Sequence, residues 1–190
     1  MNTAVSVTAQ VTPAASQQVI AASRAKHELS GALTAGQPYL AFRLAGEVYA
    51  IDILRIREII EYGLPTSVPM MPPSVRGVIN LRGAVVPIID LAVRFGHAAT
   101  GVGKRTCFVI VEAEHAGAQL VLGLMVDGVN AVLEIAAADI EPPPSFGTTA
   151  NAEFIEGMAR LDGRFVIILN IARVLSIDEI AAIKTVDAAQ

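Results

Sequence analysis

The sequence predicts an all-β protein made of two small barrels that arose by internal duplication, with a helix near the C-terminus. Residues 77–96, GVINLRGAVVPIIDLAVRFG, recur without a gap as residues 157–176, GMARLDGRFVIILNIARVLS, so the fold contains two copies of one supersecondary unit. Many short apolar segments are separated by turns that contain glycine or proline, which favours barrels or a sandwich. Strong helix signals occur in only one segment, from residue 176 onward.

The repeat separates architecture from function, because residues that both copies share are expected to serve the fold. Residues 49–61 also match residues 122–134, at a slightly different offset, and a proline-rich stretch follows in both copies. Neither copy has enough core of its own, so we expect the two to share an apolar interface. In the longer match the copies are identical at Gly77/Gly157, Leu81/Leu161, Gly83/Gly163, Val86/Val166, Ile88/Ile168 and Ala92/Ala172.

Composition narrows the class of protein. The chain has 190 residues, enough for one domain or two small ones, and carries 18 acidic against 14 basic residues. This mildly acidic balance argues against a face for nucleic acid or anionic lipid. Because neither a secretory signal nor an apolar run of about 20 residues is visible, we expect a cytoplasmic protein without direct membrane insertion. The single cysteine, Cys107, lies in an apolar run and is expected to be buried.

Residues 1–37 are predicted to form a flexible tail. They lack aromatic residues and are rich in Ala, Ser, Thr and Gln, so they bury too little apolar surface to offset the entropy of ordering. Removing residues 1–35 is therefore expected to change stability very little. The alternative is a weak helix over Ser16–Leu33, with its apolar side formed by Val19, Ala22, Leu29 and Leu33.

From residue 38 onward the pattern is typical of strands. Residues 39–44 and 47–53 flank a short Ala-Gly turn and predict a hairpin. Residues 106–113 and 119–126 predict the corresponding hairpin of the second copy. In each copy a turn-like segment then leads into a further apolar stretch, within LRIREII and GVNAVLE.

Each copy of the longer match predicts a short strand, a glycine turn and a longer strand. Gly83 and Gly163 occupy the turn positions, where a Cβ would oppose the required backbone angle. Pro87 removes a hydrogen-bond donor from the first long strand, which favours an edge position or a bulge there.

Helix starts follow the long strands. Asp90 and Asn170 are good N-caps for two short helices. Ser176 and Glu179 have the spacing of a capping box, and apolar residues follow on one helix face. These signals predict a C-terminal helix over residues 176–186.

The sequence offers no catalytic constellation, so we expect neither an enzyme nor a bound metal or cofactor. Three histidines lie far apart in the tail or in expected loops, without the spacing of metal ligands: His27, His97 and His115. No Cys-x-x-Cys, HExxH or GxSxG pattern occurs. The stretch GVGKRT at 101–106 does not match a phosphate-binding loop, because Ala98 stands where the first glycine is required.

Charges found in the first copy alone are the candidates for function. Arg82, Arg76 and Glu58 have no counterpart in the second copy, where the matching residues are Asp162, Glu156 and Ala131. An arginine at a turn tip among apolar residues can bind a partner's carboxylate through two hydrogen bonds. The alternative is an internal Glu58–Arg82 salt bridge, worth about 0.2–1 kcal/mol if exposed. The two interpretations are compatible, because such a pair would also orient Arg82.

Four segments together resemble the CheW family of bacterial chemotaxis coupling proteins: FRLAGEVYAIDILRIREII, TSVPMMPPSVRGVINLRGAVVPIIDLAVRFG, LVLGLMVDGVNAVLEI and FIEGMARLDGRFVIILNIARVLS. The resemblance covers residues 38–183 and leaves the N-terminal stretch uncovered. It implies two intertwined five-stranded SH3-like barrels, at about residues 38–100 and 104–175, followed by the helix at 176–186. The residues by themselves leave an SH3-like and an OB-like barrel open.

The resemblance also implies a function. Family members are non-catalytic adaptors that link chemoreceptors to the histidine kinase CheA, so the implied partners are the kinase's regulatory domain and the receptors' cytoplasmic tips. The regulatory domain is expected to pair barrel to barrel, and the receptor's helical hairpin to lie between the barrels. Recruitment to receptor arrays and contacts between copies of the chain are implied as well. The matching positions here are Ile56, Glu58, Arg76, Gly77, Asn80 and Arg82.

Two further functions are weaker alternatives. A CheV-like or kinase-derived regulatory module would carry an output domain, and no receiver domain of about 120 residues is present. An oligonucleotide-binding barrel needs exposed aromatic residues and positive charge, whereas this chain is acidic and has three Tyr and no Trp.

Overall fold

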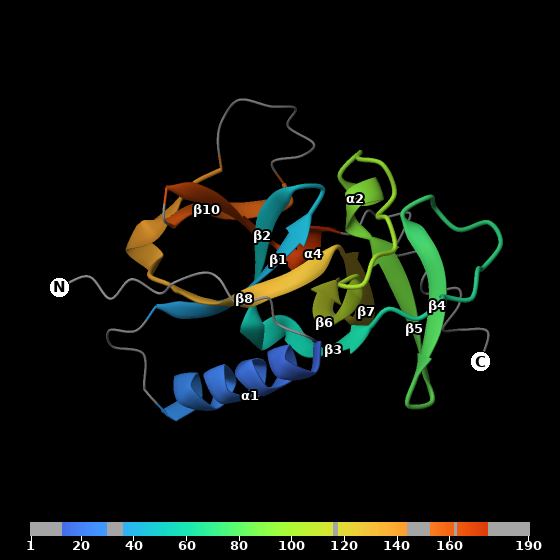
Figure 1. Cartoon of the computed structure of the whole chain (residues 1–190), viewed down its shortest axis with the longest axis horizontal. Coiled ribbons are helices and arrows are strands. Elements are labelled where there is room, and N and C mark those ends of the chain that lie inside the picture. Colours follow the sequence, from blue (N-terminus) through green and yellow to red (C-terminus); the bar gives the residue numbers. More distant parts are fainter. Residues whose placement is uncertain (1–12, 30–35, 116–117, 144–152, 162, 175–190) are drawn as a thin grey trace.

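The computed structural model describes residues 13–29, 36–115, 118–143, 153–161 and 163–174. Figure 1 shows two groups of strands lying side by side, with a long helix beneath them. The all-β prediction is confirmed, and strands occupy both copies of the repeat. In chain order the elements are α1 (Pro13–Leu29), β1 (Gln37–Leu44), β2 (Glu47–Asp52), the 3-10 helix η1 (Ile53–Arg55), β3 (Ile56–Glu61), β4 (Val75–Leu81), β5 (Ala84–Asp90), α2 (Leu91–Arg94), β6 (Cys107–His115), β7 (Ala118–Val126), β8 (Gly128–Ile135), the 3-10 helix η2 (Ala137–Asp139), β9 (Ile140–Glu141), β10 (Ile155–Leu161), β11 (Arg164–Leu169) and α4 (Ile171–Val174).

The two sheets exchange hairpins between the copies of the repeat. The first sheet has the order β8-β1-β2-β11-β10-β9, so the first-copy hairpin β1–β2 lies among second-copy strands. The second sheet has the order β3-β6-β7-β5-β4, so the second-copy hairpin β6–β7 lies among first-copy strands. This exchange intertwines the two SH3-like barrels, and the ranges 38–100 and 104–175 therefore follow the copies but not the sheets. The first sheet also has a sixth strand, the two-residue β9.

Both copies interrupt their strand pairing at the same place. Strand β3 carries one extra residue, Arg57, between Ile56 and Glu58 where it pairs with β6. Strand β8 carries an extra residue between Val129 and Ala131 where it pairs with β1. A bulge that recurs at equivalent positions belongs to the architecture of the repeat.

One buried core joins the two sheets, as the repeat predicts. It draws residues from strands of both copies, and a smaller buried cluster lies within each sheet. Aromatic rings from both copies stack in series along part of this contact, with Phe42, Tyr49, Phe95 and Phe154 separated by centroid distances of 6.0, 5.6 and 5.9 Å. The guanidinium of Arg94 lies 4.4 Å from the centroid of the Phe154 ring. Neither copy is therefore packed independently of the other.

Residues 13–29 form a helix, α1, where composition predicted part of a flexible tail. Ile20 is only 4% exposed and belongs to the shared core, and two side chains of α1 donate hydrogen bonds to β3. Average composition misses this order because composition does not show where an apolar residue such as Ile20 lies on the helix. Of the four residues that the helical alternative placed on its apolar side, Ala22 is exposed, and the side chains of the other three lie outside what the structure describes.

The short helices start where the sequence predicts. Asp90 caps α2, because its Oδ1 accepts hydrogen bonds from the N–H groups of Ala92 at 3.0 Å and Val93 at 3.4 Å. Helix α4 begins directly after Asn170. The predicted C-terminal helix over residues 176–186 lies outside the described residues.

Candidate docking site

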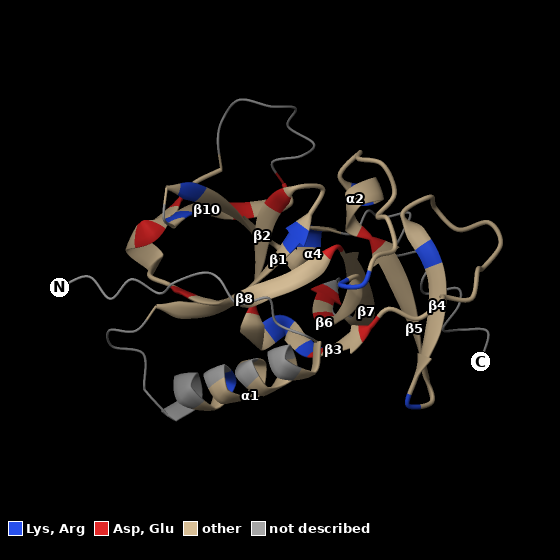
Figure 2. Ribbon diagram, viewed as in Figure 1, with Lys and Arg blue, Asp and Glu red and all other residues tan. Residues whose placement is uncertain are grey.

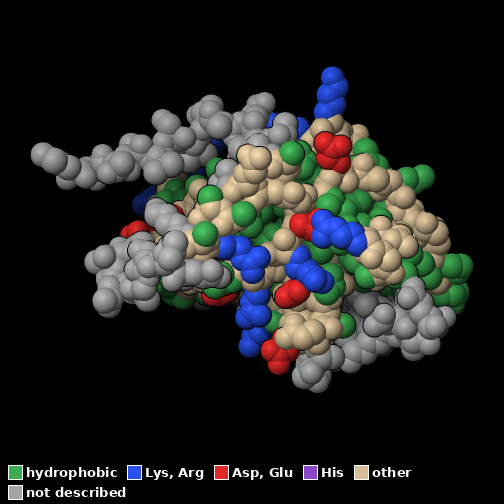
Figure 3. Space-filling view, turned by 90° about the horizontal axis from the view of Figure 1, so that it is seen from below, with side chains coloured by type: hydrophobic (Ala, Val, Ile, Leu, Met, Phe, Trp, Pro, Cys, Tyr) green, Lys and Arg blue, Asp and Glu red, His purple; other side chains and the backbone are tan. Residues whose placement is uncertain are grey.

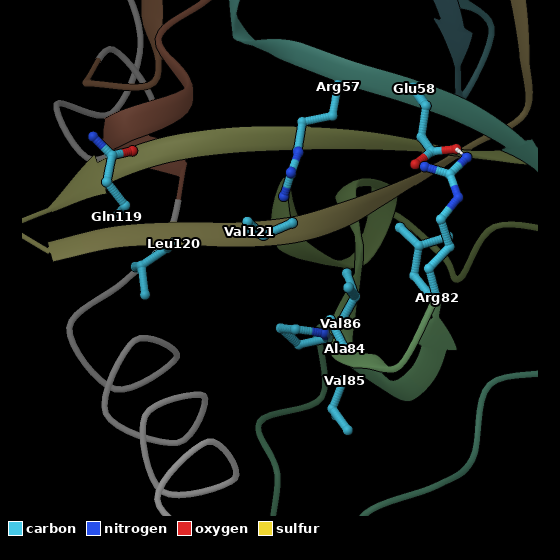
Figure 4. Close-up of a pocket in the computed structure, with 11 residues that line it drawn as sticks. Arg57, Glu58, Arg82, Ala84, Val85, Val86, Gln119, Leu120 and Val121 are labelled. Carbon is cyan, nitrogen blue, oxygen red and sulfur yellow. Dashed lines mark hydrogen bonds and ion pairs between the residues drawn. The ribbon is translucent and has the colours of Figure 1, made fainter.

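Glu58 and Arg82 form an ion pair at one side of the second sheet. Arg82 Nη2 donates to Glu58 Oε2 over 2.9 Å, as the alternative interpretation of these charges predicted. Glu58 lies on β3 and Arg82 in the turn between β4 and β5, and Figure 4 shows the two side chains directed toward each other. The Arg82 side chain is 78% exposed and that of Glu58 14%. An exposed pair contributes about 0.2–1 kcal/mol, so its main effect is to hold the guanidinium in one orientation.

Asn80 shapes the turn that carries Arg82. Its Oδ1 accepts a hydrogen bond of 2.9 Å from the N–H of Gly83. Arg82 and Gly83 adopt φ angles of 51° and 91°, the positive values that a tight hairpin turn requires. Asn80 therefore acts on the site by fixing the turn.

A pocket of about 390 Å³ opens beside the ion pair, where β5 and β7 separate. These strands pair only where residues 88–90 meet residues 123–125. Pro87 directly precedes the paired stretch and has no N–H to extend it. Strand β5 is internal, so the proline lies at the end of one pairing and not at an edge. The pocket lining combines Leu81, Ala84, Val85, Val86, Pro87, Leu120 and Val121 with the polar side chains of Arg57, Glu58, Arg82 and Gln119.

Two of the other predicted site residues make contacts inside the protein. The Ile56 side chain is 1% exposed and packs in the shared core. Arg76 stands at the opposite end of β4 from Arg82, and its Nε lies 3.9 Å from Oδ2 of the fully buried Asp90. The structure therefore brings Glu58 and Arg82 together and leaves Ile56 and Arg76 away from the exposed surface of the pair.

Gly77 lies at a bulge in β4 that recurs at Gly157 in β10. Its φ is 134°, and a Cβ there would collide with the carbonyl oxygen of Thr66. Thr66 approaches this closely because it bridges Val78 through two backbone hydrogen bonds of 2.8 and 2.9 Å. A Cβ on Gly157 would likewise meet Ile140 and Glu141. Both copies share this glycine because a neighbouring segment lies against its bare Cα.

Sequence reasoning missed residues on both sides of the pocket. Arg57, at the bulge of β3, pairs through Nε with Glu112 Oε1 at 3.0 Å. Its counterpart in the second copy is Asn130, so the comparison that selected Glu58 could also have selected Arg57. Residues 119–121 come from the exchanged hairpin, and no pattern within one copy places them beside Arg82.

The described residues also bear on what nucleic-acid, metal and membrane binding would require. Figure 2 shows basic and acidic residues interspersed over the strands, unlike the continuous basic face that binds nucleic acid. Among the described residues, no three His, Cys, Asp or Glu side chains are grouped as metal ligands would be. In the same part of the chain, no helix has the length and apolar character needed to cross a bilayer.

Cys107 is expected to be unreactive in the folded protein. Burial raises the pKa of its thiol from 9.0 to about 11, and only the thiolate reacts readily. At mildly alkaline pH the thiolate fraction is then about a hundredfold lower than for a free thiol. Ellman's reagent should accordingly label the native protein at least about a hundredfold more slowly than the same protein in guanidinium chloride. Equal rates in the two solutions would contradict the buried position.

Comparison with known proteins places this chain in one family. Residues 38–179 match the family model of the CheW-like domain. The chain is 38% identical over 153 residues to the chemotaxis protein CheW of Klebsiella aerogenes, covering 80% of this chain and 90% of that protein. It is 32% identical over 155 residues to the chemotaxis protein CheW of Rhizobium meliloti, covering 82% and 95% of the two chains.

A solved structure agrees with these sequence matches. The crystal structure of the scaffolding protein TtCheW from Thermoanaerobacter tengcongensis superposes with a TM-score of 0.66 and 36% identity. The match covers 76% of this chain and 95% of that one. Family model, relatives and fold all agree, and this chain therefore belongs to the CheW family, the non-catalytic adaptor proteins of bacterial chemotaxis.

Proposed function

We propose that this chain couples chemoreceptors to the histidine kinase CheA by binding the kinase's regulatory domain and the receptors' cytoplasmic tips. Its relatives are named chemotaxis proteins, and the similar solved structure is described as a scaffolding protein. The observation that carries the proposal is the Glu58–Arg82 pair beside an open, partly apolar pocket. That surface offers a guanidinium and apolar contact area together, the combination that partner proteins recognise.

The candidate residues divide into two roles in this proposal. Glu58 and Arg82 contact a partner directly, because both reach the surface of the pocket. Asn80 and Gly77 shape the strands and the turn that present the pair, and Arg76 ties β4 to the buried Asp90. Ile56 supports β3 from the core side.

An adaptor without a reactive centre transmits a signal only through its different affinities for partner states. The ion pair holds Arg82 in place before binding, which reduces the entropy lost when a partner carboxylate docks. Charge at this position also selects against partners of the wrong sign. By the family resemblance, the kinase domain pairs barrel to barrel with this chain, the receptor hairpin lies between the barrels, and copies of the chain extend receptor arrays in the cytoplasm.

The proposal is tested by reconstitution from purified components. The full-length chain is mixed with a receptor cytoplasmic fragment that contains the tip and with the kinase, alone and together. We expect binding to each partner and stimulation of kinase autophosphorylation only when all three are present. A single-stranded oligonucleotide serves as the negative arm. Failure to bind either protein partner, or tight binding to the oligonucleotide, would overturn the proposal.

A further inference from the structure

Helix α1 covers the open edge of β3, the strand that carries Glu58. Among the strands that the structure describes, β3 is the outermost of the second sheet and pairs with β6 alone. On its other side, Gln17 Nε2 donates to the carbonyl oxygen of Ile59 over 2.9 Å, and Arg24 Nη1 donates to that of Ile56 over 3.2 Å. Side-chain donors of α1 therefore take the place of the N–H groups that a neighbouring strand would supply.

The bulge at Arg57 makes this contact fit the helix. Carbonyl groups of alternate residues face the same edge of a strand, so Ile56 and Ile59 would ordinarily face opposite edges. The extra residue at Arg57 brings both carbonyls to the open edge. Gln17 and Arg24 are two helical turns apart and share one face of α1. The helix thus matches two acceptors on this edge.

The attachment of α1 is thin. Among the side chains of α1 that the structure describes, only Ile20 is buried. Exposed side chains flank it along the helix at Gln18, Ala21, Ala22 and Ala25. The described side chains of α1, a helix of 17 residues, attach it to the sheets through one apolar anchor and two hydrogen bonds, so we expect it to detach at a far lower free energy than the sheets unfold.

Helix α1 and the ion pair border the same space. A cavity of about 300 Å³ has Gln17, Ile20 and Arg24 on one side, and Arg57, Glu58 and Arg82 on the other. Figure 3 views the molecule from the side on which α1 lies and shows acidic and basic side chains gathered near the centre of that face. A partner that approaches Glu58 from this side meets α1 first. The helix also lies outside residues 38–179, which match the family model.

We infer that α1 is an intramolecular latch. It occupies a helix-binding site along the open edge of β3, here called its seat, and competes with a partner helix for that site. The inference rests on the proposed function, because it concerns regulation of the same docking surface. The partner it fits is a helix with an apolar anchor and side-chain donors spaced as in Gln17, Ile20 and Arg24. A partner helix can bind only while α1 is detached. Its apparent dissociation constant is therefore the intrinsic one divided by the fraction of molecules in which α1 is detached. If α1 is seated about nine-tenths of the time, its removal tightens binding about tenfold.

The test measures the affinity of the chain for a purified receptor tip fragment, a helical hairpin, by titration calorimetry. Three variants open the latch to different degrees: deletion of residues 1–30, Ile20→Asp, and the double change Gln17→Ala with Arg24→Ala. We expect the first two to bind about tenfold more tightly than the full chain and the double variant to bind more tightly by a smaller factor. Ala22→Asp, on the exposed side of α1, is the matched control and should bind as the full chain does.

The outcomes separate this inference from the proposed function. Equal affinities for the full chain and all latch variants would overturn the latch and leave the coupling function in place. Weaker binding by the double variant, which keeps Ile20, would have the same meaning. Absence of binding to both the receptor fragment and the kinase by every form would overturn the coupling function, and the latch with it. Hydrogen exchange of the Ile20→Asp variant supplies a readout without a partner, since faster exchange confined to residues 13–29 and 56–61 is expected when α1 leaves its seat.

Discussion

Replacing Arg82 with glutamate is expected to abolish receptor-dependent stimulation of the kinase while leaving the fold intact. The Arg82 side chain is 78% exposed and little packing is lost with it, but Glu58, whose side chain is 14% exposed, loses its charge partner. Within the protein the change replaces an attraction with a repulsion beside Glu58, at a cost of about 1 kcal/mol or less. At a partner interface, loss of an arginine contact costs about 2 kcal/mol or more, which is roughly a thirtyfold loss of affinity. Kinase autophosphorylation and thermal unfolding measure the two effects separately.

A charge swap distinguishes a partner contact from an internal role of the pair. The double variant Glu58→Arg with Arg82→Glu restores opposite charges across the same 2.9 Å contact but reverses what the surface presents. If the pair serves only the fold, the swap should recover stimulation. If Arg82 meets a partner carboxylate, the swap should remain inactive. Arg164→Glu, at the exposed start of β11 in the second copy, is the matched charge reversal and should retain full stimulation.

Replacing Gly77 with alanine is expected to lower stability by more than the same replacement at Gly83 or Gly157. Its φ of 134° lies in a region that other residues hardly populate, which costs about 1–3 kcal/mol. The new Cβ would also collide with the backbone oxygen of Thr66, which its two hydrogen bonds to Val78 hold in place. We expect a loss of about 3 kcal/mol or more, seen as a fall of roughly 6–12 °C in melting temperature.

The other two glycines separate the causes of that loss. Gly83 has a φ of 91° with open space around it, so Gly83→Ala carries the backbone strain alone, about 1 kcal/mol. At Gly157 a Cβ would meet the Ile140 side chain and the Glu141 backbone oxygen, and no positive φ adds to the cost. A melting temperature for Gly77→Ala equal to that of Gly83→Ala would show that the Thr66 segment yields freely.

The sequence predicts local elements well, because each depends on residues close together in the chain. The hairpin of β1 and β2, the turn at Gly83 and the cap at Asp90 follow from patterns of a few residues. The repeat also identifies Gly77 as shared and Arg82 as specific to one copy, and the structure gives Gly77 an architectural role. The pairing of Glu58 with Arg82 was open between two interpretations, and side-chain geometry was needed to observe it.

The features of the fold and site that the sequence does not reveal depend on contacts between distant segments. The family resemblance implies intertwined barrels, but no residue pattern within one copy shows that β6 and β7 join the strands of the other copy, so the Gln119 side of the pocket stays hidden. Helix α1 shows the same limit, since the segment is apolar-poor on average and is ordered by Ile20 and by carbonyls aligned through a bulge some 40 residues later. The copy comparison fails for α1 because the second copy has no counterpart to it.

The hairpin exchange constrains how this chain acquires its structure during synthesis. Strand β1 pairs with β8, and β2 pairs with β11. These partners emerge from the ribosome about 90 to 120 residues later, so β1 and β2 cannot complete their pairing before then. Pairings so distant along the chain slow the search for the native state. The nascent chain therefore exposes the unpaired edges of β1 and β2 until β8 and β11 have been made, and we expect it to depend on chaperone protection throughout that interval.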